Sequence, residues 1–237
     1  MGNSSDNDGS NNTQEEIWVN EFTEKSARVF REQMLNATKE VDKPIIINID
    51  SYGGYVDSLA SMIETISEIK LTHKIITVCR GKAISCGAIL LSLGDIRYCG
   101  EMSRTMVHNV SSASWGDAYE IKSNSNETMR LNKKFMGLLA DHCGITYEEL
   151  QSKIKSTISG KEIWMDAKGA KDMNLVDQIG LPILSNETSY AVHTLTTQKA
   201  DANKKLNTAD KNQQTKTRRR TAANIKKKKK KTTRTKK

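Results

Sequence analysis

The amino-acid sequence predicts an α/β domain with a parallel sheet, and two observations carry this prediction. Two short apolar runs rich in β-branched residues, at 45–49 and 74–79, have the composition of buried strands. Each is followed by a segment typical of a helix, at 56–69 and 85–93. An order of strand, helix, strand and helix predicts parallel strands, because the intervening helix returns the chain to the edge from which it started.

The first strand, 45–49, follows Pro44 and is too short for a helix. In the helix after it, apolar residues recur at helical spacing: Leu59, Met62, Ile63, Ile66 and Ile69. The second strand, 74–79, leads into a glycine-containing turn at 80–83. The segment 85–93 then has the composition of a packed helix.

Further along the chain, short strands are expected at 97–99 and 105–108. A long helical stretch from 116 to 142 ends at a Cys-Gly pair, a typical helix stop. Its apolar stripe is thin over the first half, as in a helix that projects and packs on a partner. Two shorter helices, 147–155 and 166–173, complete the domain.

Charge divides the chain into an acidic domain and a basic tail. The 237 residues have a formal net charge of +9, but residues 199–237 hold 17 Lys/Arg against 2 Asp/Glu, which leaves residues 1–198 at −6. Residues 1–14 are mostly Asn, Ser, Asp and Gly without apolar periodicity. We therefore expect a disordered leader at 1–14, one domain at 15–190 and a disordered basic tail at 191–237.

Composition also bounds the location of the protein. The polar N-terminus lacks the basic start and apolar run of a secretion signal, and the longest apolar stretch is far short of the ~20 residues that cross a bilayer. We therefore expect a cytoplasmic protein with no membrane partner. The chain has four cysteines: Cys79, Cys86, Cys99 and Cys143. Their spacing does not match that of a metal knuckle, so we expect reduced thiols, most of them in the core. We also expect no metal and no cofactor.

Two glycine-containing turns, 50–54 and 81–87, follow the predicted strands at the ends where parallel sheets place their sites. Gly53 and Gly54 allow backbone N–H groups to approach a ligand, and Ser85 begins a helix at the positive end of its dipole. Together these are the parts of a nucleophile with an oxyanion hole. Each also has an ordinary interpretation, a turn for the glycines and an N-cap for the serine.

A serine nucleophile needs a base, and His108 is favoured because it ends a predicted strand at the sheet edge. The other histidines have structural explanations. His73 begins a strand, His142 closes the long helix where a cation suits the dipole, and His193 lies next to the tail.

Three stretches resemble, in order and spacing, the signature blocks of the Clp protease proteolytic subunit family: INIDSYGG at 47–54, GKAISCGAILL at 81–91 and SRTMVHN at 103–109. The resemblance continues at 139–144, 165–171 and 175–177, and covers roughly residues 17–181. It implies a Clp protease/crotonase-like fold with stacked parallel sheet, helices and a projecting long handle helix. It also implies a homo-oligomer of two stacked rings around an enclosed chamber.

The same resemblance implies specific roles for four residues. The nucleophile is Ser85, the general base is His108, and the oxyanion hole consists of the backbone N–H groups of Gly54 and Cys86. Cys86 stands where the family commonly has methionine.

The family's catalytic aspartate has no direct counterpart in this sequence. An ungapped alignment back from Leu175 places Glu162 there. Glu162 either orients His108 or is a surface charge, and Asp166 is a less favoured substitute because its place suits a helix N-cap.

Both ends of the chain bear on its partners. A polar leader stands where members driven by an unfoldase have an apolar axial loop, which argues against an ATPase partner. The tail, 199–237, would bind nucleic acid through its positive charges, without reading sequence. These features suggest a phage-encoded member that trims capsid or scaffold proteins in an infected bacterial cell.

We therefore predict a serine endopeptidase that acts on protein or peptide substrates. The main alternative is a catalytically silent ring scaffold that binds nucleic acid through the tail, since the aspartate is missing. A serine/lysine peptidase with Lys133 or Lys134 as base is a second alternative. A crotonase-like enzyme acting on acyl-CoA is a third, although it would leave Ser85 and His108 unexplained.

Overall fold

The computed structural model describes residues 16–40, 43–184 and 192–194. The predicted leader, 1–14, and all but three residues of the predicted tail, 191–237, lie outside this range. The described residues up to Pro182 belong to one compact unit, and those from Ile183 onward belong to a second. At the boundary of the two units, β8 (Pro182–Leu184) begins, and it pairs with β9 (Val192–Thr194).

The first unit contains a mostly parallel sheet with the strand order β1-β2-β3-β4-β7. These strands are β1 (Ile17–Val19), β2 (Ile45–Ser51), β3 (Ile75–Ile84), β4 (Ile96–Cys99) and β7 (Gln178–Ile179). All four ladders along this order are parallel, as the alternation of strands and helices predicts. The carboxyl half of β3 also pairs with β5 (Arg104–His108), and β5 pairs antiparallel with β6 (Glu162–Asp166).

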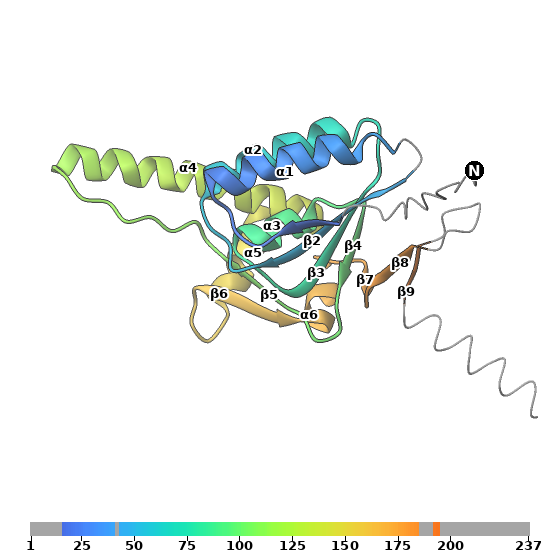
Figure 1. Cartoon of the computed structure of the whole chain (residues 1–237). Helices are drawn as coiled ribbons and strands as arrows, with labels where there is room; N and C mark the ends of the chain where they lie inside the picture. Colours follow the sequence, from blue (N-terminus) through green and yellow to red (C-terminus); the bar gives the residue numbers. More distant parts are fainter. Residues whose placement is uncertain (1–15, 41–42, 185–191, 195–237) are drawn as a thin grey trace, which may run out of the picture. The chain divides into compact units, whose positions relative to one another are not determined.

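Helices α1 (Glu24–Ala37), α2 (Val56–Ile69) and α3 (Cys86–Ser92) cover one face of this sheet (Figure 1). The predicted helix 56–69 is confirmed, and its apolar stripe is buried: Leu59, Met62, Ile66 and Ile69. Every residue of α3 is buried, so its apolar composition reflects a helix enclosed on all sides.

The turn predicted at 80–83 is wrong, because β3 continues without a break from Ile75 to Ile84. Gly81 adopts a φ of +94°, and between Ile49 and Ser51 the β2–β3 register shifts. The polar residues that suggested a loop instead pair with β2: Arg80 Nε donates to Asn48 Oδ1 at 2.6 Å, and Lys82 Nζ to Asp50 Oδ1 at 2.6 Å. The longer strand carries the chain directly to Ser85.

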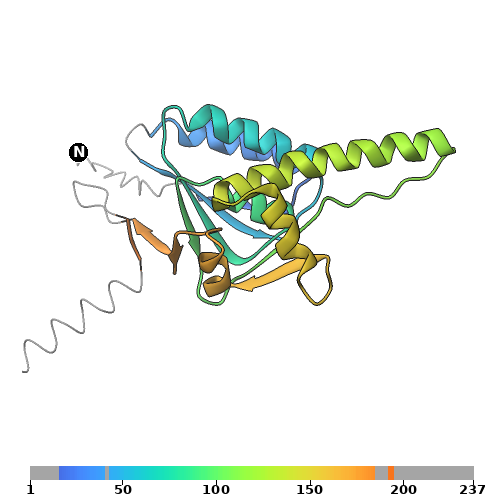
Figure 2. The ribbon, with the colours of Figure 1, turned by 180° about the vertical axis from the view of Figure 1, so that it is seen from behind.

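The long helix α4 (Ala118–Cys143) is divided between an exposed and a buried half. A capping box at Asp117 starts it, and Gly144, with φ +71°, ends it. Its buried residues all lie in the second half: Phe135, Met136, Leu139, Ala140 and Cys143. The first half projects beyond the other helices together with the segment that leads into it, as predicted (Figures 1 and 2).

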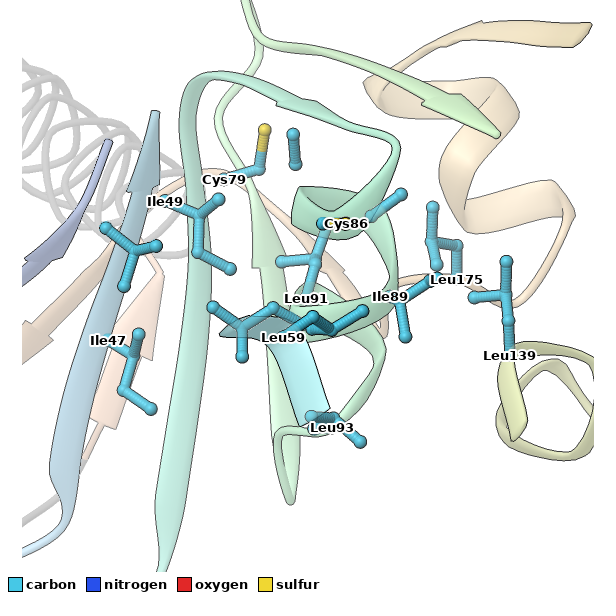
Figure 3. Packing of buried hydrophobic residues seen from close by; sticks show 14 of the residues in the cluster. Ile47, Ile49, Leu59, Cys79, Cys86, Ile89, Leu91, Leu93, Leu139 and Leu175 are labelled. Atoms are coloured by element: carbon cyan, nitrogen blue, oxygen red, sulfur yellow. The ribbon is translucent and has the colours of Figure 1, made fainter. Parts of the chain in front are cut away.

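One hydrophobic core joins the sheet to the helices. Side chains from β2, β3, α2, α3 and α4 gather in it (Figure 3), among them Ile47, Leu59, Leu91 and Leu139, each at most 1% exposed. Full burial of such a side chain stabilises a fold by roughly 1.5–3 kcal/mol. All four cysteines are free and buried in this core, as expected for most of them.

A partly buried ionic network joins the base of α4 to the end of the sheet. Arg97 donates to both carboxylate oxygens of Asp177 and to the backbone oxygens of His142 and Asn174. These hydrogen bonds lower the pKa of Asp177. Burial, reinforced by Lys70 and Arg97, lowers the pKa of His142, which disfavours the cation expected at this helix end.

Two short helices follow α4 as predicted, α5 (Tyr147–Lys155) and α6 (Ala167–Asp172). No helix among the described residues is both long and apolar enough to cross a membrane.

Candidate active site

Ser85 stands between the end of β3 and the first residue of α3. Its backbone has φ 58° and ψ −118°, a conformation that is costly for a non-glycine residue, by roughly 1–3 kcal/mol. The surrounding bonds fix it: Ser85 N donates to Met106 O at 2.9 Å, and Ser85 O accepts from Ala88 N at 3.0 Å. Ser85 occupies the N-cap position, but its side chain caps no backbone N–H, which leaves Oγ available for another partner.

That partner is His108, the last residue of β5. The parallel pairing of β3 with β5 places Ile84 opposite Met106, so the two strands end side by side. His108 Nε2 lies 2.8 Å from Ser85 Oγ, a hydrogen-bond distance. The sequence prediction named these two residues from their places at strand ends, and the structure brings them together.

The turn that holds the glycine pair lies against this serine through Gly53. Gly53 has φ +98° and Gly54 φ +152°, values that favour glycine. A Cβ on Gly53 would lie 2.8 Å from Ser85 Cβ and 2.9 Å from Ile84 O, so the backbone approach leaves no room for a side chain. Gly53 N donates to Ser51 Oγ at 3.0 Å, which helps to shape the turn.

Phe22, which the sequence prediction did not single out, holds the other side of the turn. It forms an isolated parallel bridge with Gly54, and its carbonyl accepts from Tyr55 N at 2.9 Å. A Cβ on Gly54 would lie 2.5 Å from Phe22 O. No local pattern marks Phe22 for this role, since its partner is more than thirty residues away in the sequence.

The Cys86 thiol also contacts the turn. Cys86 is 2% exposed, and its Sγ donates to Gly54 O at 3.3 Å. Burial raises the pKa of this thiol above its ordinary value, so it keeps its proton at neutral pH. A protonated, buried thiol is a poor nucleophile, which leaves Ser85 as the candidate.

Glu162 begins β6 directly opposite His108 in the antiparallel ladder. Residues paired in this way have Cβ atoms about 4.5–5.5 Å apart. Its carboxylate accepts a hydrogen bond from Trp164 Nε1 at 2.9 Å, and Arg104 lies over the Trp164 ring, 5.5 Å from its centroid. Among the described residues, Glu162 has no hydrogen bond to His108.

The other candidates lie elsewhere. Asp166 accepts from Gly169 N at 2.7 Å as the N-cap of α6, the role that its position in the sequence suggests, and its ladder partner is Arg104 rather than His108. Lys133 and Lys134 are exposed on α4, and the described hydrogen bond of the Ser85 side chain is with His108.

A family model described as Clp protease matches residues 12–182, which is most of the chain. The matched range contains all five residues named for the site from the sequence: Gly54, Ser85, Cys86, His108 and Glu162.

Proposed function

Because the chain belongs to the Clp protease family, and is a peptidase on that ground, we propose that it is a serine endopeptidase that uses Ser85 as nucleophile and His108 as general base. The observation that carries the proposal is the 2.8 Å distance between Ser85 Oγ and His108 Nε2. A hydroxyl in contact with a basic imidazole, beside backbone N–H groups, is the arrangement needed for acyl transfer.

In the first half of the reaction, Ser85 Oγ attacks the carbonyl carbon of the scissile bond while His108 Nε2 takes its proton. The carbonyl electrons move to the oxygen, which becomes an oxyanion. When the intermediate collapses, the C–N bond breaks, His108 delivers the proton to the leaving amine, and an acyl ester remains on Ser85. Water then attacks this ester through the same base, releasing the carboxylic acid and restoring the serine.

The oxyanion is stabilised by the backbone N–H groups of Gly54 and Cys86. Cys86 begins α3, where the first N–H groups of a helix have no acceptor within it. The Gly54 N–H belongs to the same turn as Gly53. This turn packs on Ser85, because Gly53 closely approaches Ser85 Cβ and Ile84 O. Two such donors aimed at the developing charge are worth several kcal/mol in water-excluded sites.

Glu162 is the third member of the triad in this proposal. It lies opposite His108 in the ladder, and the Trp164 N–H holds one carboxylate oxygen, which leaves the second to accept from His108 Nδ1. Hydrogen bonds of this kind are often long before substrate binds. In that position the carboxylate orients the ring and stabilises the imidazolium that forms.

Glu162→Gln is expected to lower kcat/KM about a hundredfold, because the amide cannot stabilise the charged imidazole. The matched control is Asp166→Asn, which removes a carboxylate from the same strand but keeps an N-cap for α6. Steady-state kinetics on a short fluorogenic peptide measures both variants. Activity of Glu162→Gln within twofold of the wild type would remove Glu162 from the triad.

Members of this family form stacked oligomeric rings, and the same assembly is proposed for this chain. The exposed half of α4 supports it, because large apolar side chains lie unburied there and just before it: Trp115, Tyr119, Ile121 and Met129. Such side chains are typical of protein contact surfaces. The substrates are then proteins or peptides that enter the enclosed chamber.

Labelling with a fluorophosphonate tests the proposal directly, since this reagent forms a covalent adduct only with an activated serine. One label for each chain is expected, mapped by mass spectrometry to the peptide that contains Ser85. An assembled, folded protein that takes up no label would contradict the peptidase mechanism and favour the catalytically silent scaffold.

A further inference from the structure

We infer that Cys86 acts through its side chain as a positioning residue, whose thiol holds Gly54 in place and so sets the distance between the two oxyanion-hole donors. The inference rests on the proposed function, because it concerns the same oxyanion hole. The observation behind it is the hydrogen bond from Cys86 Sγ to Gly54 O, at 3.3 Å.

The two donors come from separate segments of the chain, so something must fix their relative position. Gly54 follows β2, and Cys86 begins α3 after β3. The register of these strands ends with Ser51 opposite Ala83, so the ladder stops before either donor is reached. Among the described residues, the bond from Cys86 Sγ is the one hydrogen bond that joins residues 53–55 to residues 85–87.

Gly54 is the residue that most needs such an anchor. Glycine has wide freedom in both backbone dihedrals, and the φ of +152° at Gly54 is one that few other residues adopt. Phe22 bounds the turn on one side through Tyr55 N, and Cys86 binds the Gly54 carbonyl on the other. With its carbonyl held from the α3 side, Gly54 has fewer ways to turn its own N–H away from the oxyanion.

The chemistry of the thiol suits this task. Only a protonated thiol can donate to a carbonyl, and the buried Cys86 thiol keeps its proton at neutral pH because burial raises its pKa. The thiol is a weak donor, but a weak bond is sufficient to bias a turn already confined by packing against Ser85. The side chain therefore contributes to catalysis without touching the substrate.

Cys86→Ala tests the inference in the full chain, with Cys86→Ser and Cys143→Ala beside it. We expect Cys86→Ala to lower kcat about tenfold with KM within twofold, because misplaced donors weaken only the transition state. Cys86→Ser retains a hydroxyl donor and is expected to stay within about threefold of the wild type. Cys143→Ala removes an equally buried thiol from α4 and is expected to leave kcat unchanged.

The rate of fluorophosphonate labelling supplies a second readout, because the tetrahedral adduct also places an oxygen in the oxyanion hole. We expect the rate to fall in Cys86→Ala and to recover in Cys86→Ser, with circular dichroism spectra unchanged. Unchanged kcat in Cys86→Ala, or no recovery in a folded Cys86→Ser, overturns the role of the thiol. In that case, labelling of the wild type at Ser85 still supports the proposed function. A wild type that takes up no label overturns both.

Discussion

Replacing Ser85 with alanine is expected to lower kcat/KM for a peptide substrate at least about a thousandfold. The change removes the only atom that can form the acyl intermediate in the proposed mechanism, the Oγ that lies 2.8 Å from His108 Nε2. Alanine keeps the backbone conformation and the packing of the site, so the fold is retained. Peptide hydrolysis and circular dichroism of the purified variant provide the measurement.

His108→Ala should have an effect of similar size, and the double variant should lose little more, because a nucleophile and its base act as one unit. Ser67→Ala is the control, since the Ser67 hydroxyl on α2 bonds only Ile63 O and lies in an exposed position. If a folded Ser85→Ala variant retained a tenth of the wild-type activity, another nucleophile would have to be found.

Gly53→Ala is expected to lower both activity and stability. The new Cβ would lie 2.8 Å from Ser85 Cβ, and φ at this residue is +98°. Forcing alanine into this conformation costs roughly 1–3 kcal/mol, before the overlap is counted. Relief of the overlap moves the turn away from Ser85, and displacement by about 1 Å of groups that must be aligned can cost about a hundredfold in rate.

Gly137→Ala gives the matched control, because it adds the same methyl group within α4, where the new Cβ would meet nothing within 4 Å. Alanine in a helix interior is expected to stabilise the protein by roughly 0.5–1 kcal/mol relative to glycine. Thermal unfolding and peptide hydrolysis separate the two variants. Wild-type activity in Gly53→Ala would show that the turn and Ser85 do not need their close contact.

The central elements of the fold were predictable because local patterns specify them strongly. The apolar spacing in α2 and the β-branched run of β2 each allow one interpretation, and the structure has both elements as predicted. The carboxyl half of β3 was missed because its Arg, Gly and Lys are typical of a loop. Their strand conformation depends on partners in β2, such as Asn48 and Asp50.

Elements at the edge of the domain left a weaker signal. The sequence prediction assigned no element to β1 or α1, because β1 has only three residues and α1 buries only Ala27, Phe30 and Met34. The strand β6 was also missed, since its burial is slight and its pairing with β5 joins residues more than fifty positions apart. Periodicity cannot report such distant pairing.

The site shows the same division. Ser85 and His108 were selected from their positions at strand ends, and the structure sets them in contact. The contribution of Phe22 to the turn, and the bond between Trp164 and Glu162, depend on tertiary placement and leave no mark in the sequence. The bond from the Cys86 side chain to Gly54 is likewise visible only in three dimensions.

The length of β3 has a consequence for the order in which the molecule folds. Its amino half pairs with β4 and its carboxyl half with β5, so Ser85 meets His108 by closing a loop of 23 residues. Glu162, the proposed acid, follows α4 and α5 in the sequence, so its pairing with His108 closes a longer loop. Because closing a longer loop costs more entropy, the proposed nucleophile and base can form their contact early in folding, and the proposed acid completes the site last.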